Sequence, residues 1–262
     1  ASPIINKNRI RKINISRDLD QVADLIERCF PIHLDHDGQT YIREMRKTAR
    51  QMQFLGSLST LSDLDRKKAS GFVWEEEGQI IGNLSLIPFK DQEKNIYLIA
   101  NVAVDPNQRR RGIARALTNH ALDFLRRKNV AEAWLQVRDD SPAAYQLYRS
   151  TGFVDHVVRT TWRIQPVEFN LLEKGRIKNT HVGKRHKEDW EFQRKWLLKR
   201  YPKSIRWSLP VNFSRFEPGL LQKIANIFEG VALKHWTISN QKECLGAVTW
   251  QKTSTYANNI WL

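Results

Sequence analysis

Residues 101–153 read NVAVDPNQRRRGIARALTNHALDFLRRKNVAEAWLQVRDDSPAAYQLYRSTGF, and the fold of the surrounding residues depends on this segment. The apolar run at 96–104 is typical of a β-strand, and the residues at 105–107 predict a turn that ends it. A basic turn containing Gly112 then opens a helix. The apolar stripe of that helix consists of Ile113, Leu117, Ala121 and Phe124.

The turn at 109–114 has the chemistry of an anion site. Backbone N–H groups at the start of a helix lack partners, and the helix dipole is positive there. Gly112 lets the backbone approach a ligand closely, and three successive arginines add donors that match phosphate oxygens. The turn has neither the Gly-Lys-Ser/Thr of a P-loop nor the three spaced glycines of a dinucleotide site. A pyrophosphate suits it, and the alternative is a basic helix start that merely faces solvent.

The segment resembles the GCN5-related N-acetyltransferase (GNAT) superfamily in two blocks. The first block of that family is a V-x-V strand, a turn and R/Q-x-x-G-x-G/A, and the second is N-x-x-A-x-x-L-Y-x-x-x-G-F. The first is matched by Val102, Ala103, Val104, Arg109, Gly112 and Ala114. The second is matched by Ala144, Leu147, Tyr148, Gly152 and Phe153, with Ser141 in place of the asparagine. The resemblance covers about residues 9–163 and implies an α+β fold with a mixed sheet.

The resemblance implies acetyl-CoA as the cosubstrate. In the family, two parallel strands splay apart, the backbone of the first pairs with the pantetheine arm, and the helix turn holds the pyrophosphate. The resemblance places cofactor binding at Val102, Ala103, Val104, Arg109, Arg110, Arg111, Gly112, Ile113, Ala114, Arg115 and Ser141. Serine still offers a cap and a hydroxyl where many members have asparagine.

Tyr148 is the residue that we predict to be catalytic. A phenol can donate a hydrogen bond or a proton to the thiolate that leaves in acyl transfer. Ala144 lies one turn earlier on the same helix face and leaves room for the pantetheine arm. The alternative is a core tyrosine that packs its helix, and the match of the whole block favours the functional role. Tyr145, one position off that face, is predicted to be structural.

Gln136 departs from the nearest motif neighbours. The ribosomal-protein alanine N-acetyltransferases read L-E-V-R at this strand and use the glutamate as general base, whereas this chain reads Leu135-Gln136-Val137-Arg138. An amide cannot take a proton from an amine. The general base and the acceptor are therefore left unassigned by the sequence.

Composition indicates a globular protein. The chain has 262 residues, of which 41% are apolar and 27% charged, and no apolar run reaches the length of a membrane span. Cys29 and Cys244 are predicted to be free thiols of a reducing cytosol, so we expect a cytoplasmic protein. His33, Asp35, His36 and Asp37 follow no zinc-ligand spacing, so we expect a solvated loop and no metal. The net charge of +15 can attract polyanions.

Hydrophobic periodicity predicts the remaining elements of residues 1–163, the GNAT domain. Strands are expected at 9–15, 71–75, 79–86, 96–104, 131–137 and 156–164. Helices are expected from Asp18 to Phe30, and at 39–54, 112–128 and 141–152. Residues 56–69 are expected to be a connection.

Residues 164–262 are predicted to be a partial second GNAT-like domain, the second part of a tandem repeat. With a shift of 164 residues and no gap, 72–74 falls on 236–238, Gly82 on Gly246, and 97–98 on 261–262. Leu84 and Leu86 then meet Val248 and Trp250, and a helix at 220–231 answers to 18–30 less closely. The sequence stops before a second cofactor turn, which we interpret as a fragment. A basic, aromatic segment at 174–206 suits either an amphipathic helix or single-stranded nucleic acid.

The predicted function is transfer of an acetyl group from acetyl-CoA to a primary amine by direct attack in a ternary complex. The acceptor is a small molecule or a peptide or protein amine, with no membrane and with nucleic acid not favoured. The alternative is a non-catalytic module that binds acyl-CoA or nucleic acid, which the missing general base favours.

Overall fold

The structure is a computed structural model. It describes residues 9–30, 36–55, 70–91, 94–160, 179–209, 212–228, 230–240, 243–252 and 259–261. The chain divides into two compact units, Ala1–Asp155 and His156–Leu262. The division falls before the predicted boundary at residue 163, and the identity of the two units as domains stays a prediction.

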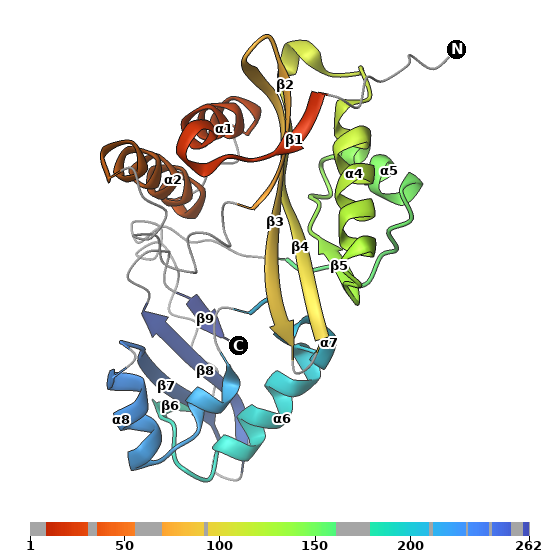
Figure 1. The fold of residues 1–262 in the computed structure, drawn as a ribbon. Helices are drawn as coiled ribbons and strands as arrows, with labels where there is room; N and C mark the ends of the chain where they lie inside the picture. Colours follow the sequence, from red (N-terminus) through yellow and green to blue (C-terminus); the bar gives the residue numbers. More distant parts are fainter. Residues whose placement is uncertain are drawn as a thin grey trace. The chain divides into compact units, whose positions relative to one another are not determined.

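The first unit is built on a mixed sheet in the order β1-β2-β3-β4-β5 (Figure 1). Its strands are β1 (Ile10–Lys12), β2 (Gly71–Glu76), β3 (Gln79–Asp91), β4 (Lys94–Val104) and β5 (Glu132–Leu135). Neighbouring strands are antiparallel except β4 and β5, which run parallel. The predicted α+β class with a mixed sheet is confirmed.

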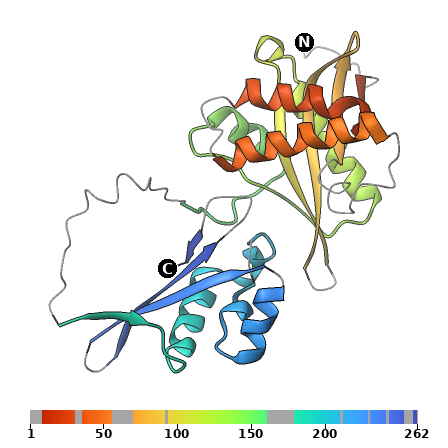
Figure 2. The ribbon, with the colours of Figure 1, turned by 90° about the vertical axis from the view of Figure 1, so that its left-hand side faces the viewer.

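Helices cover both faces of this sheet. Figure 2 shows α1 (Ile15–Cys29) and α2 (His36–Leu55) side by side across one face, and Figure 1 shows α4 (Ile113–Arg127) on the other. The short helix α5 (Pro142–Ser150) follows β5. Successive residues of β2 alternate between the two cores: Phe72 and Trp74 pack on the α4 side, and Val73 packs on the α1 side.

Asn14 begins α1 earlier than the sequence predicted. Its side chain accepts a hydrogen bond from the backbone N–H of Ser16, at 3.2 Å, so the strand expected at 9–15 stops at Lys12. Asp18, predicted to open the helix, instead lies in its first turn and is completely buried.

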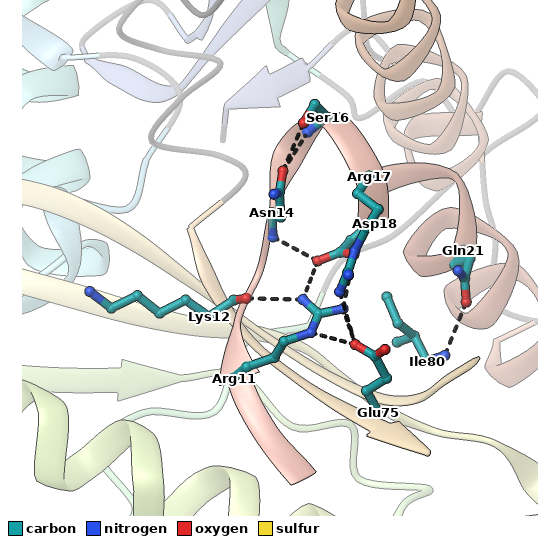
Figure 3. Close-up of polar contacts among 9 residues, drawn as sticks. All are labelled: Arg11, Lys12, Asn14, Ser16, Arg17, Asp18, Gln21, Glu75 and Ile80. Carbon is teal, nitrogen blue, oxygen red and sulfur yellow. Dashed lines mark hydrogen bonds and ion pairs between the residues drawn. The ribbon is translucent and has the colours of Figure 1, made fainter. Parts of the chain in front are cut away.

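Asp18 is the centre of a polar network that joins β1, α1 and β2 (Figure 3). Its carboxylate accepts from Arg11 Nη2 at 3.0 Å, from the backbone N–H of Asn14 at 2.6 Å, and from Arg17 Nε at 3.0 Å. Arg11 also pairs with Glu75 on β2. Burial favours the neutral acid, but these donors outweigh it and lower the pKa of Asp18.

Two predicted strands near the end of the first unit are wrong in extent. The strand expected at 131–137 is limited to β5, and residues 156–160 form no strand. The rest of the expected strand at 156–164 lies outside the described residues, as does the connection predicted at 56–69.

The second unit has its own antiparallel sheet in the order β6-β7-β8-β9. Its strands are β6 (His181–Lys184), β7 (Ala232–Ser239), β8 (Cys244–Lys252) and β9 (Asn259–Trp261). Its helices are α6 (Trp190–Arg200), α7 (Lys203–Arg206) and α8 (Leu220–Phe228). The core contains Trp190, Leu197, Phe213, Phe216 and Trp261. Within the basic, aromatic segment predicted at 174–206, α6 buries Trp190 and Leu197 and exposes its basic side chains, while β6 and α7 occupy other described parts of the segment.

The two sheets share strand order, register and a bulge. Phe72 pairs with Leu84 in the first unit, and Trp236 pairs with Val248 in the second, which is the same pairing moved by the offset of 164. The register shifts after Trp74 in β2 and after Ile238 in β7. Because a bulge occupies the equivalent place in both, the match supports the predicted repeat.

Candidate functional site

The parallel pair β4 and β5 separates halfway along β4. Pairing runs from Ile96 with Glu132 to Ile99 with Leu135, and beyond Ile99 no described strand pairs with this side of β4. On its other side, β4 stays paired to β3 as far as Val104 with Gly82. The backbone at 100–104 therefore has one strand edge without a described partner, which suits an extended guest.

Asn101 marks a bulge at the beginning of this unpaired stretch. Its φ is +50°, in the left-handed region, and the register with β3 shifts between Asn83 and Ser85. A left-handed residue inside a strand is strained for most residue types, although asparagine tolerates it better than others. The bulge thus sets the direction in which 102–104 leave the regular sheet.

The predicted anion turn has the geometry that such a site needs. Arg110 and Gly112 both take left-handed conformations, with φ of +67° and +78°. The first hydrogen bond into α4 is from the N–H of Ala116 to the carbonyl of Gly112, at 3.0 Å. The N–H groups of 113–115 precede it and have no backbone partner among the described residues. They form a cluster of free donors at the positive end of a helix.

The arginines predicted to bind the cofactor differ in whether their guanidinium groups already bond to the protein. The guanidinium of Arg111 donates to Glu76 at 2.8 Å, and that of Arg109 donates to the carbonyl of Val104 at 3.3 Å. Arg110 and Arg115 are exposed and pair with no carboxylate that the structure describes. Within the described part of the turn, these last two keep an uncommitted guanidinium for an anion.

Glu76 fixes Arg111 in this structural role. Desolvation opposes the charged form, but hydrogen bonds from Trp74, Arg111 and Arg9 lower the pKa of Glu76 to about 2. The carboxylate is therefore charged at any physiological pH, and it ties the turn to the end of β2.

Gly82 on β3 lets α4 approach the sheet. A Cβ atom there would lie 2.9 Å from Ile113 Cγ2 and 3.1 Å from Leu117 Cδ1. Real Cβ atoms do not come so close to a neighbouring side chain. The glycine thus sets how near the first turn of α4 lies to the sheet.

Tyr148 lies on α5 with its ring buried and 9% of its surface exposed. The ring meets the edge of Phe153, with 6.1 Å between ring centroids, and Phe153 packs on the same core as Val102 and Val104. Burial raises the pKa of Tyr148 to about 12. Its hydroxyl has no described hydrogen-bond partner, and it is not one of the polar atoms that are sealed from solvent.

Tyr145 and Ser141 have local partners. Tyr145 is exposed and its hydroxyl donates to Asp155 at 2.8 Å, in keeping with a structural role. Ser141 occupies the N-cap position of α5, but its side chain does not cap the helix. Its hydroxyl instead donates to Asp140 Oδ1 at 3.3 Å, so the predicted N-cap position is confirmed without the side-chain capping bond.

The segment after β5 holds Gln136 at the position where the nearest motif neighbours have their glutamate base. Gln136 is exposed beyond the end of β5. Arg138 donates two hydrogen bonds to the carboxylate of Asp140, at 3.0 and 2.9 Å. This pairing raises the pKa of the guanidinium of Arg138. The carboxylate of Asp140 is thus engaged by Arg138 in an exposed ion pair.

Four polar side chains that the sequence analysis missed lie beside the bulge. Asn101 Nδ2 donates to Tyr41 Oη on α2 at 2.9 Å and to Ser85 Oγ at 3.4 Å. Asn83 Nδ2 donates to the carbonyl of Asn101 at 2.9 Å and to Ser85 Oγ at 3.3 Å. We call these residues the bulge cluster. Asparagines inside two predicted strands were the available sequence signal.

The solvated loop expected at His33, Asp35, His36 and Asp37 is wrong for the last two, which begin α2. His33 and Asp35 lie outside the described residues, and the side chains of His36 and Asp37 are not described. Within the described ranges, no three metal-ligating side chains come together. The described helices also include none with the length and apolar character of a membrane span.

Comparisons with known proteins agree on the family. The sequence model of the Acetyltransferase (GNAT) family matches residues 19–153, just over half of the chain. The ribosomal protein bS18-alanine N-acetyltransferase of Escherichia coli (strain K12) is 44% identical over 62 residues, which are 24% of this chain and 42% of that protein. The mycothiol acetyltransferase of Kocuria rhizophila is 28% identical over 147 residues, 55% of this chain and 45% of that protein.

The chain thus spans less than half the length of each of these relatives. A solved GCN5-related N-acetyltransferase from Ralstonia eutropha JMP134 covers 59% of this chain and 97% of its own, with 24% identity and a TM-score of 0.44. A likeness of that size adds nothing to the assignment, which depends on the match of the family model. By that match, this chain belongs to the GNAT acetyltransferase family.

Proposed function

We propose that this chain transfers an acetyl group from acetyl-CoA to a primary amine in a direct ternary complex. One observation carries the proposal: the unpaired stretch of β4 leads through a left-handed turn to free N–H groups of α4. The strand edge suits the amides of a pantetheine arm, and the helix start suits a pyrophosphate. Residues 1–163 are the proposed catalytic domain, and 164–262 the partial second one.

The cofactor contacts that we propose are of two kinds. Val102, Ala103 and Val104 would meet the pantetheine through the backbone. The turn from Arg109 to Arg115 would meet the pyrophosphate, mainly through the N–H groups of Gly112, Ile113 and Ala114. Arg110 and Arg115 are the side chains that remain uncommitted to described carboxylates, so they are the proposed charged contacts.

The reaction needs a neutral amine whose nitrogen attacks the thioester carbon while the C–S bond breaks. A backbone N–H of β4 directed at the thioester oxygen would stabilise the charge that develops there. Tyr148, with a pKa of about 12, stays protonated at working pH. Full proton transfer to a thiolate of pKa about 8.5 would be uphill by roughly 5 kcal/mol. We therefore assign Tyr148 a hydrogen bond to the leaving thiolate, which takes its proton from solvent.

The acceptor is proposed at the level of a primary amine. One relative is named for the alanine of ribosomal protein bS18 and the other for mycothiol, which are chemically distinct. Gln136 in place of a glutamate weighs against the alanine acceptor with its carboxylate base. Free amines of small molecules or of peptides therefore stay equal candidates, and the cytoplasmic location stays a prediction.

Calorimetric titration with acetyl-CoA tests the proposal. Gly112→Glu should abolish binding, because it adds a side chain and a negative charge at a left-handed anion turn. Gly230→Glu is the matched control, since Gly230 is also left-handed, with φ of +67°, and has open space around it. An amine panel of an alanine-initiated peptide, glucosamine and spermidine, read by thiol release, comes next. Absence of binding to the parent would overturn the proposal.

A non-catalytic acyl-CoA sensor is the second candidate, and Gln136 in place of a glutamate, with Asp140 paired to Arg138, favours it. It predicts acetyl-CoA binding without thiol release for any amine of the panel. Its nucleic-acid version would use α6, where Arg200 stacks on the exposed Trp196 at 4.6 Å. That version requires salt-dependent binding to single-stranded RNA that is lost in Arg194→Gln/Lys195→Gln.

A further inference from the structure

The bulge cluster combines two features that cost folding free energy. Asn101 holds a left-handed backbone inside β4. Asn83 is 1% exposed, and its Oδ1 is sealed from solvent without a hydrogen-bond donor. A buried polar atom left unsatisfied costs about 1–3 kcal/mol. Such costs concentrate at functional sites, and both fall beside the unpaired stretch of β4.

The orientation of Asn83 is set by its neighbour. Its Nδ2 donates to the carbonyl of Asn101, so turning the amide over would set two oxygens against each other. The bond holds the left-handed backbone of Asn101 from the β3 side. The orientation of Asn83 that holds the bulge therefore leaves its own Oδ1 without a hydrogen bond.

The side chain of Asn101 is held just as firmly. Its Nδ2 donates one hydrogen to Tyr41 Oη and the other to Ser85 Oγ. Both amide hydrogens are then used, and Oδ1 is left without a described donor. Unlike Asn83, which is fully buried, Asn101 is partly exposed. The contact to Tyr41 places it on the face covered by α2, the face on which Ala103 also packs.

We propose that Asn101 Oδ1 positions the acceptor amine, with Tyr41 as the residue that holds Asn101. The inference rests on the proposed acetyl transfer. An amide oxygen accepts an N–H of a neutral amine without removing its proton, and thereby directs the nitrogen lone pair. Its place next to 102–104 puts that nitrogen beside the thioester carbon. The C–N bond forms, the C–S bond breaks, and the proton released from nitrogen goes to water.

This role suits a site without a carboxylate base. The amine arrives neutral from solution, and the protein supplies orientation. The chemical class of acceptor is then a primary amine whose nitrogen can donate one hydrogen bond while it attacks. A tertiary amine lacks that hydrogen and should not bind productively.

Asn101→Gly is the decisive variant, because glycine keeps the left-handed backbone and removes only the side chain. Asn129→Gly is the matched control: Asn129 has φ of +51° but lies at the end of α4. We expect Asn101→Gly to lower kcat/KM for the best amine of the panel about tenfold, the worth of one strong hydrogen bond. The Kd of this variant for acetyl-CoA should stay within about twofold of the parent value, because the substitution keeps the backbone that is proposed to hold the cofactor.

Tyr41→Phe tests the proposal independently, because it removes the hydrogen bond between Tyr41 and Asn101. We expect a loss of about threefold in kcat/KM for the amine, because Ser85 still holds Asn101 and a neutral hydrogen bond is worth about 1 kcal/mol. Tyr97→Phe on β4, whose ring packs on the opposite core, should leave kcat/KM unchanged.

The outcomes separate this inference from the proposed function. If the parent binds and turns over acetyl-CoA while Asn101→Gly keeps the full kcat/KM for the amine, the inference alone is wrong. If Asn101→Gly weakens acetyl-CoA binding as much as it weakens amine use, Asn101 shapes the cofactor strand and does not hold the amine. A parent that binds no acetyl-CoA would remove both.

Discussion

The two units show the same antiparallel framework with different polar interiors. In the first, β1, α1 and β2 are joined by ions around the buried Asp18. In the second, the carboxylate of Asp189 is partly exposed, accepts from the N–H of His186 and from Thr237, and interacts electrostatically with Arg185 without an ion-pair hydrogen bond among the described residues. The sheet geometry therefore does not depend on one polar arrangement.

The larger difference between the units lies in the elements that come after the shared strands. The candidate site of the first unit uses the end of β4, the turn at Gly112, α4 and β5. Asn83, central to the bulge cluster, has Ala247 as its counterpart in the shared register. The hairpins common to both units, β2–β3 and β7–β8, thus provide the shared framework. The proposed chemistry depends on residues and elements that only the first unit has among the described residues.

The largest expected effect is a loss of stability, and it should differ between the carboxylates of Asp18 and Asp189. Asp18→Asn should destabilise the first unit by about 3 kcal/mol, because it leaves the guanidinium of Arg11 without its buried partner. Asp189→Asn should cost the second unit less than about 1 kcal/mol, since neutral hydrogen bonds replace the lost ones. Hydrogen exchange on peptides from each unit measures both. Equal losses would show that the two polar interiors are equivalent.

Acid should unfold the second unit first. Burial, with the nearby Arg185, lowers the pKa of His235 to about 4, below its usual 6.5. Between these values the unfolded state binds the proton and the folded state does not, so stability falls as pH falls, by at most about 3 kcal/mol.

The lowered pKa of Asp18 acts in the same direction but over a lower range. Its contribution is present above its usual pKa of 3.8 and is lost as pH falls through its folded value. Hydrogen exchange at pH 7, 5.5 and 4.5 should show second-unit peptides losing protection first. His235→Gln should remove that difference, and a first unit that opens first would contradict the assignment.

Tyr148 and the half-buried Tyr201 should differ in function. Tyr148→Phe is expected to lower kcat by about 10- to 100-fold, the worth of a hydrogen bond to a charged thiolate, with acetyl-CoA binding kept. Tyr201 in the second unit is likewise buried enough for its pKa to be raised, and it packs against Phe213 and Trp261. Tyr201→Phe should leave kcat unchanged. Thiol-release kinetics check both, and an active Tyr148→Phe would refute the role of the phenol.

The smallest expected effect compares two aligned glycines. Gly82→Ala should destabilise the first unit by about 1–3 kcal/mol, because the added methyl collides with Ile113. Nothing lies within 4 Å of a Cβ built on Gly246, so Gly246→Ala should be neutral or stabilise by up to about 1 kcal/mol. Urea unfolding of the two variants gives the comparison. A loss at Gly246 would reveal a packing partner there.

Local sequence patterns were sufficient to predict the elements that form from a single short segment of the chain. Apolar runs bounded by turns predicted β2, β3 and β4, and the glycine turn predicted the start of α4, because each depends on neighbours in sequence. The hairpin register of the second unit was likewise visible as an ungapped offset.

Partners distant in sequence were not predictable. Asp18 resembles an N-cap, but Arg11 and Glu75 draw it into the interior, and Asn14 takes the capping role. Three adjacent arginines look alike until the fold sets Glu76 opposite Arg111. The bond from Asn83 to the Asn101 carbonyl spans 18 positions, and only the pairing of β3 with β4 brings the two together.

The unpaired edge of β4 also bears on how long the protein survives in a cell. A strand edge without a partner is a template for strands of other chains, so it invites aggregation. On the proposed function, bound acetyl-CoA would occupy that edge, and ligand at a hundred times its Kd would add about 2.7 kcal/mol to stability. The abundance of the protein would then depend on the supply of its own cosubstrate, with metabolic state setting its turnover before any acceptor is met.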